Sequence, residues 1–336
     1  MSITEDDWRR LDTPQGTPGR SLRRLHPESP HDLFIVVTYP SRQRMLLLKT
    51  NAITYEQASD ALGHLPRTLG LEIRFVRLTR REYELHIALT ADELREVFSS
   101  LVTDIAAAVQ AAPDALSAVV TAINRFQRWQ NLLKSVGEEG LGKEERRGLF
   151  GELLVLRDFV LPGLAVSDAL ASWTGPTGTS QDFQLPRLAI EVKTSSARAS
   201  SEISIASERQ LDDTGVEELF LALVVVDERR GGTGASLNTM AESTRAAITS
   251  LAAQTLFSDL LVRAGYFSNH RDRYDEPRYT VREIRFWAVK NDFPRIIEPE
   301  LRTGVSTCAY RIQTAGLDTY RIPGNEVKKI IRGTHG

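Results

Sequence analysis

Cysteine is almost absent from this sequence: Cys308 is the only one in 336 residues. A single cysteine excludes an internal disulfide framework and suits a reducing compartment. The six histidines lie scattered, without the spacing of a Cys/His zinc site. The sequence also lacks a Ser-His-Asp arrangement and a glycine-rich dinucleotide fingerprint, which disfavours hydrolases and dinucleotide-dependent enzymes of those kinds.

An excess of charge of one sign is missing as well. The 42 basic and 44 acidic residues leave a formal net charge of -2. Any contact with nucleic acid must therefore come from a local patch rather than from overall charge.

Long hydrophobic runs are also missing. The main apolar run, at residues 220–226, is far shorter than the about 20 apolar residues that cross a bilayer. The first residues have neither the basic end nor the apolar run of a signal peptide. We therefore expect a cytoplasmic protein without membrane contact, long enough for two domains.

The chain is predicted to have three parts. Residues 1–30 are polar and contain several prolines, so we expect an extended N-terminal segment with little regular structure. Residues 31–138 are predicted to form a β-rich N-terminal domain plus helices, and glycines at 137, 140 and 142 mark its end. Residues 139–336 form the third part. The expected elements of the N-terminal domain are strands at 33–38, 44–49, 72–78 and 83–89, the last two paired as a hairpin, and helices at 94–111 and 114–136.

Two details of those helices matter below. Thr90 and Glu93 have the spacing of a capping box at the start of the first helix. The second helix carries Arg125, Arg128 and Lys134 beside an apolar side, a pattern that fits either a solvated helix face or a phosphate-facing patch.

An acidic residue stands out in the next predicted helix, residues 144–161, which is apolar almost all round. Glu152 lies between Leu149 and Leu156 on the helical wheel. Its carboxylate therefore enters an apolar environment, which is unfavourable unless a metal ion or a basic partner lies there.

The stretch 173–195 holds the most informative pattern. A loop rich in Gly, Thr and Ser leads to Asp182, a turn follows at 185–187, and residues 188–194 alternate as a strand. Glu191 and Lys193 are two apart and share one face of that strand. Two carboxylates and an amine then converge on a hard-cation site of the kind Mg²⁺ uses. The competing interpretation is a solvated strand face, because Glu-x-Lys also arises by chance.

The elements that follow complete the pattern. They are a strand at 202–206, a short helix capped by Ser207, a buried strand at 218–226, a helical segment at 237–265, strands at 279–289 and 307–312, and a basic tail. The glycines at 231–234 are expected to form a flexible loop.

The order helix, three strands, helix, strand, with acids at these places, resembles the PD-(D/E)XK nuclease superfamily. The resemblance covers about residues 144–227. It implies an α/β (α+β) fold with a restriction-endonuclease-like αβββαβ core in a nuclease-like domain at 139–336, followed by a C-terminal extension. Gln181 stands in place of the Pro of the superfamily's name, which supplies no ligand.

The resemblance also implies roles for particular residues. Asp182 and Glu191 would ligate Mg²⁺ or Mn²⁺, Glu152 would be an accessory carboxylate or third ligand, and Lys193 would assist the attacking water. Related nucleases have a Gln on the next helix near the site, so Gln210 is a candidate. The alternative for Gln210 is an exposed polar helix residue.

A second similarity is carried by Arg128-Trp129, residues 148–153 and residues 205–211. These resemble a bacterial family of PD-(D/E)XK members often encoded beside DNA-defence ATPases and methyltransferases. It implies DNA as the substrate, ATPase or methyltransferase subunits as candidate partners, and antiviral defence as the setting. A homodimer is another option for assembly.

Two hypotheses for function follow. The first is a Mg²⁺-dependent DNA endonuclease of a restriction or phage-defence system that acts with partner subunits. The second is a catalytically inactive nuclease-fold subunit that binds nucleic acid or scaffolds a defence complex. The second does not require Glu152, Asp182, Glu191 and Lys193 to be present together, and all four are present.

Overall fold

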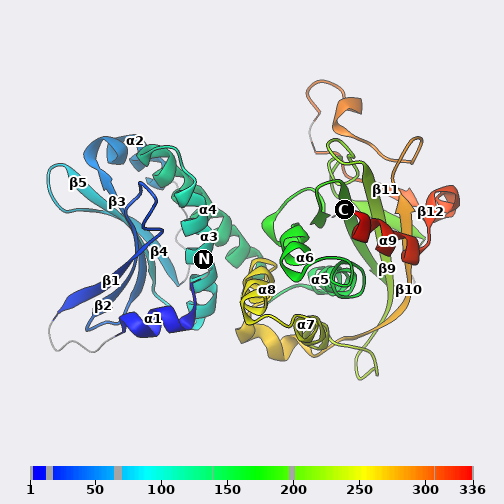
Figure 1. Ribbon diagram of the computed structural model, residues 1–336, viewed down its shortest axis with the longest axis horizontal. Coiled ribbons are helices and arrows are strands. Elements are labelled where there is room, and N and C mark those ends of the chain that lie inside the picture. Colours follow the sequence, from blue (N-terminus) through cyan, green and yellow to red (C-terminus); the bar gives the residue numbers. More distant parts are fainter. Residues whose placement is uncertain are drawn as a thin grey trace. The chain divides into compact units, whose positions relative to one another are not determined.

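The chain divides into two compact units (Figure 1). The computed structural model describes residues 3–12, 18–63, 70–137, 139–196, 201–305 and 307–334. One unit comprises Met1–Glu138 and Phe267–Asn269, and the other comprises Glu139–Tyr266 and His270–Gly336. Two glycines flank the division, Gly137 and Gly140, whose φ angles of 56° and 76° favour glycine. Glu138, between them, lies outside the described residues.

The N-terminal unit is built on an antiparallel sheet in the order β1-β2-β3-β5-β4. The predicted hairpin is confirmed, with Arg77 opposite Tyr83 and Leu71 opposite Leu89. The strands are β1 (Gly19–Leu25), β2 (Leu33–Tyr39), β3 (Arg44–Asn51), β4 (Leu71–Arg77) and β5 (Glu82–Leu89).

Helices complete this unit, namely α1 (Glu5–Leu11), α2 (Ala52–Gly63), η1 (Asp92–Leu94), α3 (Arg95–Gln110) and α4 (Ala115–Val136). The start of α4 is the expected one, since the Asp114 carboxylate accepts a hydrogen bond from the Ser117 N–H at 2.8 Å. The predicted Thr90 capping box is wrong. The Thr90 N–H donates instead to the Gly70 carbonyl at 2.9 Å, which prolongs the β4–β5 pairing, and no side chain caps η1.

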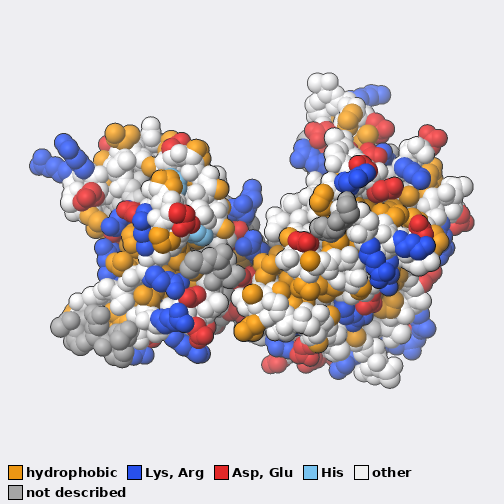
Figure 2. Space-filling model, in the orientation of Figure 1, with side chains coloured by type: hydrophobic (Ala, Val, Ile, Leu, Met, Phe, Trp, Pro, Cys, Tyr) orange, Lys and Arg blue, Asp and Glu red, His pale blue; other side chains and the backbone are white. Residues whose placement is uncertain are grey.

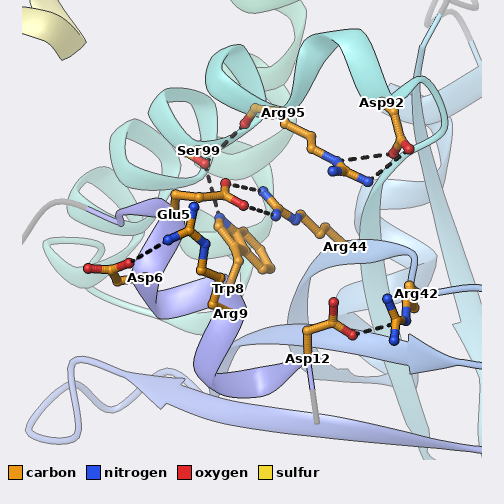
Figure 3. Close-up of polar contacts among 10 residues, drawn as sticks. All are labelled: Glu5, Asp6, Trp8, Arg9, Asp12, Arg42, Arg44, Asp92, Arg95 and Ser99. Carbon is orange, nitrogen blue, oxygen red and sulfur yellow. Dashed lines mark hydrogen bonds and ion pairs between the residues drawn. The ribbon is translucent and has the colours of Figure 1, made fainter. Parts of the chain in front are cut away.

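The prediction of an extended segment at 1–30 is also wrong, because α1 and β1 lie there. Trp8 is fully buried, and its indole N–H donates to Ser99 Oγ of α3 at 3.0 Å. Arg44 of β3 pairs with Glu5 (Figure 3). One aromatic anchor and ion pairs to distant elements order a segment whose composition is polar.

The basic side of α4 is partly neutralised within the unit. Asp104 of α3 lies 3.2 Å from Arg125 and accepts a hydrogen bond from the Trp129 indole at 3.1 Å. Arg128 and Lys134 stay exposed. Over the face of the molecule in Figure 2, Lys and Arg side chains are interspersed with Asp and Glu.

The C-terminal unit has a mixed central sheet in the order β12-β10-β9-β7-β6. β7 and β9 run parallel, and the other neighbours are antiparallel. The chain thus has the predicted α/β (α+β) class. The strands of the unit are β6 (Phe183–Gln184), β7 (Leu188–Ser196), β8 (Glu202–Ile205), β9 (Glu218–Arg229), β10 (Arg278–Ala288), β11 (Tyr310–Gln313) and β12 (Arg321–Ile322).

Two details of the predicted αβββαβ order are corrected. β8 pairs with β11 in a separate two-stranded sheet, and its Ile203 and Ile205 pack on Leu221 and Leu223 of β9. β8 is therefore not a strand of the central sheet, and its apolar side chains cover one face of that sheet. Residues 208–211 form turns and not the helix expected after Ser207.

Helices cover the other face of the central sheet, where α5 packs on β7. The predicted helix at 144–161 is α5 followed by a short π-helix, η2, and the segment at 237–265 is broken into α7 and α8. Among the described residues, no helix combines the length and apolar character needed to span a membrane. The helical segments of the unit, not all of which lie on that face, are α5 (Lys143–Val155), η2 (Leu156–Val160), α6 (Val166–Ser172), η3 (Gly175–Thr177), α7 (Leu237–Ala246), α8 (Leu251–Arg263), η5 (Ser268–Tyr274, whose first two residues belong to the N-terminal unit), η6 (Glu298–Glu300), η7 (Thr314–Gly316), η8 (Asp318–Tyr320) and α9 (Gly324–Gly333).

Candidate active site

The candidate site surrounds β7. Alternate residues of a strand point to opposite faces, so Ile190, Val192 and Thr194 point toward α5. Glu191 and Lys193 point to the opposite face, in register with Leu221 and Leu223, against which β8 packs. The face of Glu191 is not solvated, because only 2% of this residue is exposed. The solvated-face interpretation therefore does not hold for Glu191.

Close packing of α5 on β7 places Glu152 at the site. A Cβ added to Gly151 would lie 1.9 Å from Thr194 Oγ1, so only glycine allows the helix to approach this strand so closely. Gly148, on the same helix, has open space around it. Glu152, the residue after Gly151, thereby reaches the site from the helical side of the sheet.

Asp182 reaches the site at the edge of the sheet. β6 has only two residues, so it pairs with β7 only as far as Ile190. Beyond that point, Asp182 Oδ2 accepts a hydrogen bond from the backbone N–H of Val192 at 2.7 Å. The backbone N–H groups of Thr174 and Gly175 donate to the carbonyl of Asp182 at 2.8 and 3.0 Å, which fixes the residue before β6.

Glu152 and Asp182 converge at Gly175. A Cβ added there would lie 2.9 Å from Glu152 Oε2 and 3.0 Å from Asp182 Oδ1. The indole N–H of Trp173 donates to Glu152 Oε2 at 2.9 Å. Trp173 and Gly175 are site residues whose roles the sequence analysis did not identify, although both belong to the stretch it singled out.

Lys193 joins the two remaining candidates. Its Nζ lies 2.8 Å from Glu191 Oε1 and donates to Gln210 Oε1 at 3.0 Å. Gln210 Oε1 also accepts a hydrogen bond from the Ala206 N–H at 2.8 Å. Gln210 is therefore a half-buried turn residue in contact with Lys193, and not an exposed helix residue. All five candidate side chains thus lie in one region, since Glu152 and Asp182 meet at Gly175 and the charge of Lys193 acts on all three carboxyls.

Burial raises the pKa values of the three carboxyls at the site, and neighbouring negative charge adds to the shift for Glu152 and Glu191. Burial raises the pKa of Glu152 to about 8, and the negative charge of Asp182 adds to this effect. Burial also raises the pKa of Asp182 to about 6, against the opposing effects of the Val192 N–H and Lys193. The pKa of Glu191 lies well above its ordinary range because of burial and Asp182, although Lys193 opposes the shift. Lys193 alone therefore does not balance three carboxylates, and a further cation would favour their ionised forms.

Carboxylate oxygens are the donors that hard divalent cations prefer, and Glu152 and Asp182 are only half-buried and so accessible to an ion. In donor type and charge, the residues fit such a cation, with Asp182 and Glu191 as ligands and Glu152 beside them. In the described part of the chain, no three His, Cys, Asp or Glu residues are grouped as a ready ligand set. A three-carboxylate site would therefore require these side chains to shift.

The α+β fold is consistent with a protein of the PD-(D/E)XK type. In a comparison with sequence models of protein families, residues 4–315 match the family described as "Putative PD-(D/E)XK family member, (DUF4420)". The chain belongs to this family, and the match includes nearly all of the N-terminal unit, which the resemblance at 144–227 had left out. Neither the curated proteins nor the solved structures yield a match.

Proposed function

We propose that the protein is a nuclease that hydrolyses phosphodiester bonds of DNA with the help of a divalent cation, Mg²⁺ or Mn²⁺. One observation carries the proposal: Glu152, Asp182 and Glu191 approach one another around Lys193, and folding raises the pKa values of all three carboxyls. Like charges brought together against their own repulsion favour a bound cation. Membership of the PD-(D/E)XK family supports the same chemistry.

Each side chain has a role in this proposal. Asp182 and Glu191 would hold the cation, and Glu152 would add a third oxygen or orient a water. A bound divalent cation neutralises charge on a phosphate oxygen and lowers the pKa of water. Lys193, held by Gln210 and Glu191, would stabilise negative charge on the phosphate or, once deprotonated, accept the proton of the attacking water.

The biological setting proposed here is a restriction or phage-defence system. ATPase or methyltransferase subunits are the proposed partners. A homodimer is the alternative assembly.

A second candidate function is an inactive nuclease-fold subunit that binds nucleic acid or scaffolds a defence complex. The absence of a ready three-ligand group among the described residues favours it. So does Glu191, whose carboxylate is already paired with the Lys193 ammonium. Both features are compatible with a nuclease fold in which the carboxylates are present but do not bind a catalytic cation.

Incubation of the purified full chain with supercoiled plasmid tests the proposal, in EDTA and with Mg²⁺ or Mn²⁺. The wild type is expected to nick or linearise DNA only with the cation. Asp182→Asn, which removes a ligand charge but keeps the shape, is expected to abolish cleavage. Asp292→Asn is the matched control, since Asp292 is an exposed residue after β10. Equal cleavage by Asp182→Asn and Asp292→Asn would contradict the metal assignment, and DNA binding without cleavage would favour the second function.

A further inference from the structure

Gln181 has a set of contacts that the metal site does not explain. It precedes Asp182 and is 8% exposed. Its Nε2 donates to the carbonyls of Arg209 at 3.0 Å and Asp212 at 3.2 Å. Its Oε1 accepts a hydrogen bond from Gln184 Nε2 at 2.8 Å, which orients the amide with its donors toward that turn. The buried side chain of Gln181 thus connects the chain next to Asp182 to both ends of the turn at residues 209–212.

Those turn residues include Gln210, whose Oε1 contacts Lys193 Nζ at 3.0 Å. A second side chain also holds this turn, because Arg295 donates a hydrogen bond to the Leu211 carbonyl at 2.8 Å. No helix holds the turn, since residues 208–211 have no helical structure. Side chains from elsewhere in the unit must therefore satisfy the turn carbonyls and fix the place of Gln210.

We propose that Gln181 is a positioning residue: it holds the 209–212 turn so that Gln210 Oε1 meets Lys193 Nζ. This inference rests on the proposed function for its catalytic consequence. Proline at this position would have no donor to offer the turn. The residue found here in place of the superfamily's proline therefore adds a connection between Asp182 and Lys193, through the turn and Gln210.

The first test needs neither DNA nor metal. The Ala206 N–H donates to Gln210 Oε1, so its hydrogen exchange reports whether Gln210 is in place. Gln181→Met keeps the length of the side chain but removes both donors. We expect Ala206 exchange in Gln181→Met to accelerate about tenfold, as one lost hydrogen bond does, and to approach the rate in Gln210→Ala. Gln313→Met is the matched control, because Gln313 donates to Glu202 on the β8–β11 sheet and does not contact the turn.

The second test is single-turnover cleavage at saturating cation and DNA. Gln181→Met and Gln210→Ala should each slow cleavage by about tenfold with little change in the affinity for cation or DNA. The double variant should be no slower than Gln210→Ala, because Gln181 acts through Gln210. A purely structural Gln181 would instead slow the Gln210→Ala background by the same factor again.

The outcomes are separable from the proposed nuclease function. Ala206 exchange equal in Gln181→Met and wild type overturns the inference, whether or not the protein cleaves DNA. The inference is also overturned if Ala206 exchange is faster in Gln181→Met but the two substitutions lower the cleavage rate independently, so that their effects multiply in the double variant. If Gln181→Met does not fold, Gln181→Leu, which is uncharged and also lacks both donors, is subject to the same two criteria.

Discussion

Glu152→Gln is the sharpest test of whether Glu152 belongs to a cation site. Folding raises the pKa of Glu152 from 4.5 to about 8. A carboxyl with a raised pKa holds its proton more tightly in the folded state. The metal-free fold therefore loses stability relative to the unfolded chain as pH rises from about 4.5 to about 8, and the loss is complete above that range.

The magnitude follows from the shift. At about 1.4 kcal/mol per pKa unit, an ionised Glu152 destabilises the metal-free fold by up to about 5 kcal/mol at pH 9. This value is an upper limit because the side chain is only half-buried and solvent screens part of the charge. Gln cannot ionise, and its carbonyl can still accept the Trp173 N–H. We therefore expect Glu152→Gln to match wild type near pH 5 and to exceed it by a few kcal/mol at pH 9.

Thermal melts in EDTA at pH 5, 7 and 9 measure this difference. A second series with Mg²⁺ or Mn²⁺ should show a smaller stabilisation of Glu152→Gln than of wild type, because the ion loses an oxygen donor. Glu217→Gln is the control, since Glu217 is an exposed carboxylate paired with Arg187. A variant that melts far below wild type in EDTA at every pH, yet keeps the full cation-induced upshift, would show that Glu152 is structural and would refute the reasoning.

Two further predictions concern β7. Lys193→Ala should slow single-turnover cleavage by orders of magnitude while cation binding, measured by calorimetry, stays largely intact. A variant that loses cation affinity but still cleaves DNA would show that the role proposed for Lys193 is wrong. Gly151→Ala should destabilise the C-terminal unit by about 1–3 kcal/mol, because the new Cβ would lie 1.9 Å from Thr194 Oγ1. Urea unfolding measures that loss, and Thr194→Ala, which removes Oγ1, should restore part of it; a Gly151→Ala protein as stable as wild type would contradict the packing argument.

Locally encoded elements were predictable from the sequence. The β4–β5 hairpin follows from alternation on both sides of a short turn, and α4 begins where Asp114 can cap it. The apolar run at 220–226 lies within β9, where it is almost fully buried. In each case, neighbours in the chain supply most of the interactions that select the conformation.

Elements held by distant partners were not predictable in the same way. Trp8 orders α1 through a contact with Ser99, far along the chain. The backbone of Thr90 is held by Gly70 on the other side of the hairpin, so its cap does not form. β8 pairs with β11, a strand about a hundred residues later. Propensity and spacing carry no information about such long-range contacts.

For the candidate site, the sequence by itself determined which groups are available and that Glu191 and Lys193 share a strand face, because strand periodicity is a local property. Only the tertiary structure decided that Glu152 meets Asp182 over Gly175 and that Gln181 connects the Asp182 edge to the Gln210 turn. Carboxyl pKa values also depend on it, since burial and neighbouring charges arise only when α5, the edge of β7 and the 209–212 turn pack together.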